Sequence, residues 1–158
     1  MNLLRINWET IITYCEQLAH KIDFKPDIII GVSRGGLVPT RILSDIMGIS
    51  EIGIVGIKFY KGVGETNDKP KITQELTIDL KGKKVLIVDD VADSGKSLLA
   101  AKNYIIARGA RIIKTATLHF KPSSIFTPDY YLMCTDAWIV YPWEIHETER
   151  EIEKNQST

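Results

Sequence analysis

An apolar run that ends on two adjacent acids and then enters a Gly/Ser loop constrains this chain more than any other feature. Residues 85–88 (VLIV) are short, apolar and rich in β-branched side chains, as in a buried parallel strand. Asp89 and Asp90 follow directly, so we expect their carboxylates at the carboxyl end of that strand, where open α/β sheets bind ligands. Residues 85–97 therefore predict a strand, a ligand-binding loop and a helix.

The loop after the acids has the chemistry of a phosphate site. Ser94, Gly95, Lys96 and Ser97 offer backbone N–H groups and hydroxyls at the start of a helix, which suits a phosphate monoester. The end of this loop matches a nucleotide-triphosphate P-loop, but Asp90 stands where that motif needs a glycine and would repel a triphosphate. Adjacent acids instead suit vicinal ribose hydroxyls, or Mg²⁺ bridging them to a pyrophosphate. The ligand implied is a sugar that carries a 5-phosphate.

This combination of strand, paired acids and phosphate loop resembles the phosphoribosyl-pyrophosphate signature of the type I phosphoribosyltransferases. The resemblance implies that Asp89 and Asp90 bind the ribose hydroxyls and Mg²⁺, and that residues 94–97 bind the 5-phosphate. It also implies phosphoribosyl pyrophosphate and a base as substrates, and a homo-oligomer such as a dimer or tetramer. In its 6-oxopurine members an aspartate at the place of Asp93 faces N7 of the base as proton acceptor, whereas the plain alternative for Asp93 is a helix cap.

A second loop of the same kind follows the apolar run 27–32. Ser33 and Arg34 are followed by Gly35 and Gly36. A guanidinium beside glycines that let backbone N–H groups approach closely suits pyrophosphate. The alternative is an ordinary strand-to-helix turn with an exposed arginine. The family resemblance favours the pyrophosphate loop, where relatives often hold a strained or cis peptide.

Base recognition is expected near the carboxyl end of the chain. Lys121 only donates hydrogen bonds, so it favours a base carbonyl and therefore a 6-oxopurine over adenine. Trp138 can stack on the ring, and the backbone of Ile139 can address the base edge, although Trp138 could equally be a core tryptophan. This region resembles the xanthine-guanine and hypoxanthine-guanine enzymes, except that Glu144 replaces their usual aspartate. Arg150 matches an arginine that contacts pyrophosphate in the hypoxanthine-guanine type.

The hydrophobic pattern predicts an α/β fold, with a mostly parallel sheet, helices on both faces and a small C-terminal hood. We expect one domain over residues 1–158, a base-binding hood at about 121–150, a flexible loop at 60–73 and a disordered tail from about Glu151. The predicted helices are 8–22, 38–47 and one from 97 to about 108. The predicted strands are 27–32, 52–59, 74–80, 85–88, 112–119, 130–133 and 138–141.

Composition limits the remaining function classes. The formal net charge is zero at pH 7, which argues against a general binder of nucleic acid or membrane surfaces. Cys15 and Cys134 have no metal-ligand spacing, so both are expected to be reduced core residues. No signal-like amino terminus is present, and the expected location is the cytoplasm.

The sequence thus predicts a Mg²⁺-dependent purine salvage enzyme that transfers the 5-phosphoribosyl group from phosphoribosyl pyrophosphate to hypoxanthine, guanine or xanthine. Two alternatives remain open. One is a phosphoribosyltransferase that acts on a pyrimidine or adenine. The other is a non-catalytic regulator that senses phosphoribosyl pyrophosphate with the same pocket.

Overall fold

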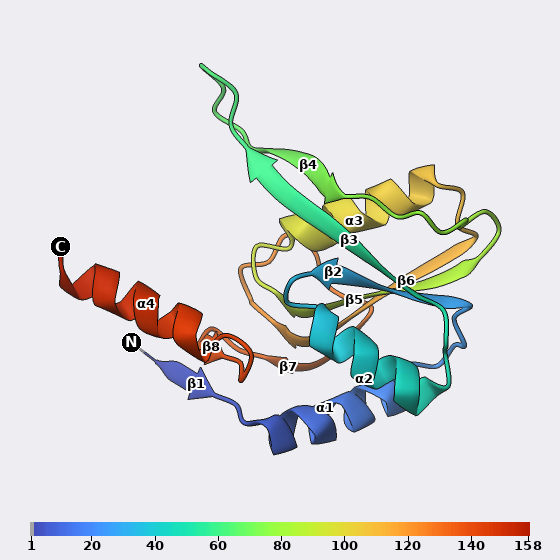
Figure 1. Cartoon of the computed structure of the whole chain (residues 1–158), viewed down its shortest axis with the longest axis horizontal. Helices are drawn as coiled ribbons and strands as arrows, with labels where there is room; N and C mark the ends of the chain where they lie inside the picture. Colours follow the sequence, from blue (N-terminus) through green and yellow to red (C-terminus); the bar gives the residue numbers. More distant parts are fainter. Residues whose placement is uncertain (1) are drawn as a thin grey trace.

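A six-stranded sheet forms the centre of the protein in the computed structural model, which describes residues 2–158 (Figure 1). The strand order is β4-β3-β2-β5-β6-β7, and every neighbouring pair is parallel except β3 and β4. The strands are β2 (Ile28–Ser33), β3 (Ile52–Tyr60), β4 (Lys69–Gln74), β5 (Lys84–Ala92), β6 (Ile112–Phe120) and β7 (Tyr130–Cys134). The predicted mostly parallel α/β sheet is confirmed.

Helices cover both faces of this sheet, as the sequence predicted. One face carries α1 (Trp8–Lys21) and α2 (Leu37–Met47), and the other carries α3 (Lys96–Ala107) (Figure 1). The buried strands feed both layers because successive side chains point to opposite faces. Ile29 packs with α1 and α2, whereas Ile28 and Ile30 pack with α3. No helix within residues 2–158 is long and apolar enough to cross a membrane.

The order of the strands fixes where a ligand can bind. The chain runs from β2 outward to β3 and β4, then returns to place β5 on the other side of β2 and continues to β6 and β7. The loops after β2 and β5 therefore lead to helices on opposite faces and diverge between the two central strands. Such a switch point is where open α/β sheets leave a crevice, and both predicted ligand loops lie there.

Local signals mark the start of α1 and the end of α3 where the sequence predicted them. Asn7 caps α1, because its side-chain oxygen accepts a hydrogen bond of 2.8 Å from the Thr10 backbone N–H. Gly109 follows α3 with a φ of 86°, a left-handed conformation that glycine adopts without steric cost.

A small two-stranded sheet carries the carboxyl-terminal part. Its strands, β1 (Leu3–Arg5) and β8 (Trp138–Val140), are parallel, and the sequence analysis did not predict β1. Leu3 pairs with Trp138 and Arg5 with Val140, so the amino terminus supports the segment expected to bind the base. Helix α4 (Ile145–Gln156) follows β8 and ends the chain.

Three sequence predictions are wrong. The strand expected at 74–80 lies instead at β4, Lys69–Gln74, because an exposed edge strand rich in lysine and proline lacks the apolar alternation of a buried strand. The tail from Glu151 is the second half of α4 and not disordered; α4 consists mostly of charged and polar residues and buries only Thr148, so its composition resembles that of a disordered segment. Cys134 is exposed at the end of β7, whereas Cys15 is buried as predicted.

Helix α1 provides a matched test of the core. Leu18 is fully buried and Ile12, on the same helix, is 45% exposed. We expect Leu18→Ala to lower the free energy of unfolding by about 2–5 kcal/mol, because it removes buried methyl groups and leaves a cavity. Ile12→Ala should change it by less than about 1 kcal/mol. Urea unfolding of both variants measures the contrast, and equal losses would contradict this description of the core.

Candidate functional site

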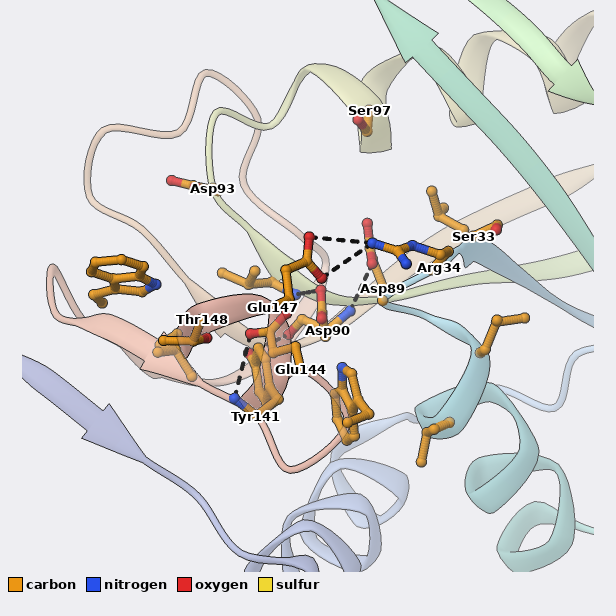
Figure 2. A pocket seen from close by; sticks show the side chains of 18 of the residues that line it. Ser33, Arg34, Asp89, Asp90, Asp93, Ser97, Tyr141, Glu144, Glu147 and Thr148 are labelled. Carbon is orange, nitrogen blue, oxygen red and sulfur yellow. Dashed lines mark hydrogen bonds and ion pairs between the residues drawn. The ribbon is translucent and has the colours of Figure 1, made fainter. Parts of the chain in front are cut away.

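A cavity of about 570 Å³ opens at the carboxyl ends of β2 and β5 (Figure 2). It brings together most of the predicted site residues, namely Ser33, Arg34, Gly35, Asp89, Asp90, Asp93, Ser97, Lys121, Trp138, Ile139 and Glu144. A smaller cavity of about 80 Å³ shares Asp89, Asp93 and Ser97 with it and is also lined by Ser94 and Gly95. Residues from four separate segments of the sequence thus converge on one site.

The two central loops touch at Gly35 and Asp90. A Cβ atom added to Gly35 would collide with the carboxylate of Asp90, so only glycine allows this approach. The peptide between Ser33 and Arg34 is cis, as the family resemblance suggested. Asp90 is 8% exposed, and its carboxylate accepts a hydrogen bond of 2.7 Å from the Val91 backbone N–H.

The loop at residues 94–97 has the geometry expected of a phosphate site. Gly95 has a φ of 82°, and an added Cβ atom would collide with the Ser124 hydroxyl. The Ser94 carbonyl accepts a hydrogen bond of 2.9 Å from the Ile125 N–H, which fixes the loop on its outer side. The Lys96 ammonium lies 3.9 Å from Asp68, at the loop end of the hairpin formed by β3 and β4.

Asp93 is not a helix cap. The residue before α3 is Gly95, and it is the Ser94 hydroxyl, not Asp93, that accepts a hydrogen bond of 3.3 Å from the Lys96 backbone N–H at the start of the helix. Asp93 is exposed and lines both cavities, between the acids and the phosphate loop. The plain alternative for this residue is therefore wrong, and its carboxylate is free to meet a ligand.

The predicted base-binding residues lie at the hood side of the cavity. The Lys121 ammonium donates a hydrogen bond to the carbonyl of Ala137, directly before Trp138. The Trp138 backbone N–H donates a hydrogen bond of 2.9 Å to the Asn2 carbonyl, and Ile139 is buried. Trp138 is partly exposed and lines the cavity, so its ring is available to a ligand.

Helix α4 contributes residues that the sequence analysis missed. Glu147, Thr148 and Glu151 line the cavity, together with the predicted Glu144 just before the helix. Their spacing of three, four and seven residues from Glu144 is that of one helix face, but no helix was predicted here and Glu151 was expected to begin a disordered tail. Tyr141 and Trp143 also line the cavity and were not predicted as site residues.

The two predicted arginines differ in position. Arg34 lies at the cavity, where its Nη2 is 3.1 Å from Glu147 Oε2 and 3.2 Å from Glu147 Oε1 (Figure 2). Arg150 is exposed and is not among the residues that line the cavity. Its contact with pyrophosphate stays a prediction.

The acids of the site are held in surroundings that disfavour their charge. Burial raises the pKa of Asp89 well above its usual range, and the neighbouring charge of Asp90 raises it further. Burial also raises the pKa of Asp90. For Glu144, burial and then the charge of Asp90 raise the pKa to about 7. A cation beside these carboxylates would relieve both effects.

The donor set fits Mg²⁺ in part. Adjacent carboxylates at Asp89 and Asp90 provide the hard oxygen ligands that this ion prefers. Among the described residues, no cluster of three or more Asp, Glu, His or Cys side chains is arranged to hold a metal ion. The protein thus offers the kind of incomplete coordination that Mg²⁺ completes with substrate oxygens and water.

Comparison with known proteins points to one family. Residues 7–150 match the phosphoribosyl transferase domain. The chain is 33% identical over 149 residues to the xanthine-guanine phosphoribosyltransferase of Vibrio atlanticus, with 90% of each chain covered.

Solved structures agree. The purine phosphoribosyltransferase of Pyrococcus horikoshii is 43% identical, with a TM-score of 0.84 over 90% of this chain and 95% of that one. A Neisseria gonorrhoeae protein with bound ppGpp is 27% identical, with a TM-score of 0.81 over 98% of each chain.

The raised pKa of Glu144 generates a prediction about stability. The folded protein binds this proton more tightly than the unfolded chain, so stability falls as pH rises from about 4.5 to about 7 and stays lower above that. The free energy of unfolding of Glu144→Gln should therefore exceed that of the wild-type protein by about 1 kcal/mol at pH 8 and nearly equal it at pH 5. The difference is small because solvent screens the half-exposed carboxyl. Denaturant unfolding at both pH values measures this.

The control for this prediction is Glu153→Gln, at an exposed position of the same helix. It should show no comparable gain at pH 8. A gain in Glu144→Gln that does not depend on pH would contradict the assignment to the carboxyl charge.

Proposed function

The chain belongs to the phosphoribosyltransferase family, and we propose that it transfers the 5-phosphoribosyl group from phosphoribosyl pyrophosphate to a 6-oxopurine base, releasing pyrophosphate. It is a purine salvage enzyme of the transferase class. The observation that carries this proposal is the convergence of the paired acids, the pyrophosphate loop and Lys121 on one cavity, with the phosphate loop on the smaller cavity beside it. The P. horikoshii and V. atlanticus relatives, both purine enzymes by name, support it.

The sugar end of the substrate lies along β5 and the start of α3 in this proposal. Asp89 and Asp90 accept hydrogen bonds from the ribose hydroxyls and would hold Mg²⁺, which, when bound, offsets the negative charge of the leaving pyrophosphate. Residues 94–97 bind the 5-phosphate through backbone N–H groups at the start of α3. The small cavity beside Gly95 supports this position.

The pyrophosphate end lies at the loop after β2. Gly35 lets this loop lie against Asp90, so pyrophosphate bound by Arg34 and nearby N–H groups is adjacent to the sugar. The bond that breaks joins the anomeric carbon to a pyrophosphate oxygen, and a base nitrogen takes its place. Stabilising the departing charge in a partly enclosed site is expected to supply much of the rate enhancement.

The base is placed between Lys121 and Trp138. The Lys121 ammonium donates to the 6-carbonyl, Trp138 stacks on the ring, and Ile139 addresses the opposite edge. Asp93, which lines both cavities, would accept a hydrogen bond or the proton of the base during the reaction. Glu144, whose pKa is raised to about 7, would contact the base edge in place of the family's aspartate.

The N. gonorrhoeae relative supports guanine among the bases, because ppGpp is a guanine nucleotide. The role of residues 121–150 as a base-binding hood, the homo-oligomer and the cytoplasmic location remain predictions from the sequence.

The first experiment is pyrophosphate release from phosphoribosyl pyrophosphate and Mg²⁺, measured separately with hypoxanthine, guanine, xanthine, adenine and uracil. We expect turnover with one or more 6-oxopurines and none with adenine, because Lys121 offers only donors and adenine carries an amine where these bases carry a carbonyl. Uracil has carbonyl groups but a single ring, and it tests the pyrimidine alternative. Turnover with adenine or uracil alone would instead favour the other acceptor class. Tight binding of phosphoribosyl pyrophosphate without turnover of any base would favour the sensor.

Lys121 gives a sharper test of base recognition. In Lys121→Ala we expect the KM for the 6-oxopurine to rise about 10- to 100-fold, as for a lost hydrogen bond from a charged donor. The affinity for phosphoribosyl pyrophosphate should stay within about twofold, since Lys121 does not line the small cavity beside Ser94 and Gly95. Steady-state kinetics and calorimetric binding measure the two quantities.

Lys121→Met keeps the aliphatic stem and should give the same result. Lys114→Ala, on β6 but outside the cavity, is the matched control. An unchanged KM for the base in both Lys121 variants would contradict the proposed contact.

A further inference from the structure

We propose that Tyr141 and His119 are positioning residues that hold Asp90 in the orientation needed to bind the ribose. A buried chain of hydrogen bonds links them: His119 Nδ1 lies 2.7 Å from the Tyr141 hydroxyl, which lies 3.1 Å from the Asp90 carbonyl oxygen. The inference rests on the proposed function, because it assumes that Asp90 binds the sugar.

The strand pairing explains why Asp90 needs such support. Strand β2 pairs with β5 only as far as Val88, whereas β6 pairs with β5 as far as Ala92. Asp90 therefore lies on a part of β5 that has a strand neighbour on one side only. The hydroxyl of Tyr141, directly after β8, supplies a partner for its carbonyl. Gly35 lies against the carboxylate, so Asp90 is held through both its side chain and its backbone.

The number of protons available determines which group donates and which accepts in each of these hydrogen bonds. The Tyr141 hydroxyl has one proton, and the Asp90 carbonyl can only accept, so that proton is donated to Asp90. His119 Nδ1 must then carry a proton and donate it to the Tyr141 oxygen. Burial lowers the pKa of His119 to about 4, so its ring is neutral at pH 7 and Nε2 carries no proton. Nε2 is also buried without a partner among the described residues.

Packing leaves the two side chains little freedom. His119 is fully buried and Tyr141 is 1% exposed. The ring of Trp143 stacks on that of Tyr141, with centroids 4.8 Å apart and planes within 6°. The stack with Trp143 fixes the plane of the Tyr141 ring, and the hydrogen bond from His119 orients its hydroxyl. Because Tyr141 also follows the strand that carries Trp138, it joins the base side of the cavity to the sugar side (Figure 2).

Tyr141→Phe tests the positioning role, because it removes one hydroxyl and keeps the stacked ring. We expect the KM for phosphoribosyl pyrophosphate to rise about 5- to 20-fold while the KM for the base stays within about twofold. A merely structural role would lower the melting temperature and the active fraction without this selective change. Calorimetric binding of phosphoribosyl pyrophosphate with Mg²⁺ gives the same comparison without turnover.

Tyr14→Phe is the matched control. Tyr14 also packs edge-on against His119, with ring centroids 5.7 Å apart, but its hydroxyl makes no hydrogen bond within the part of the chain that the structure describes. Its loss should leave both KM values unchanged.

His119 provides a second test that does not depend on the folding of the Tyr141 variant. His119→Leu removes the donor and should raise the KM for phosphoribosyl pyrophosphate, whereas His119→Asn, whose amide can donate from near the Nδ1 position, should restore part of the affinity. Nitrogen-15 NMR of the wild-type protein should show His119 with its proton on Nδ1.

An unchanged affinity for phosphoribosyl pyrophosphate in both Tyr141→Phe and His119→Leu, or a proton on Nε2 of His119, would overturn the positioning role. Failure of the wild-type protein to bind phosphoribosyl pyrophosphate would instead contradict the proposed function, and is measured in the same titration.

Discussion

The contact between the Gly35 backbone and the Asp90 carboxylate is the constraint on which the site depends. It exists because β2 and β5 are neighbours in the sheet, with Gly31 opposite Val88, so the loop after β2 meets the part of β5 that extends beyond this pair. Any side chain at residue 35 would displace the acid. The spacing between the loop after β2 and the paired acids is therefore set by the sheet itself and does not rely on flexible side chains.

Negative charge at the site is concentrated beyond what the protein alone neutralises. Asp89 and Asp90 are adjacent and largely enclosed, and burial raises the pKa of both. Glu144 stands close enough for the charge of Asp90 to raise its pKa as well. A site built this way favours a ligand that brings a cation with it and disfavours a free anion. That preference agrees with a phosphorylated sugar that binds together with Mg²⁺, as is general in this family.

The sequence predicted the core of this arrangement because its signals are local. The run 85–97 contains strand, acids and phosphate loop within one continuous segment, and residues 27–36 contain the second loop. The parts that were missed depend on tertiary contacts. Strand β1 is three residues long and exists through its pairing with β8, and α4 has almost no apolar face. The His119–Tyr141–Asp90 chain joins residues that are 22 and 51 positions apart, a proximity that no spacing rule encodes.

Helix α4 provides a carboxylate that competes with the proposed pyrophosphate for Arg34, in the loop after β2. Glu147 pairs with Arg34, the same guanidinium proposed to bind pyrophosphate. The Arg34 side chain is 79% exposed and that of Glu147 44%, and an ion pair so open to water stabilises the protein by at most about 1 kcal/mol. A pyrophosphate carries more charge than one carboxylate and can accept bidentate hydrogen bonds from the same fork. The pair therefore orients Arg34 over the cavity before substrate arrives, at an energy that the substrate readily exceeds.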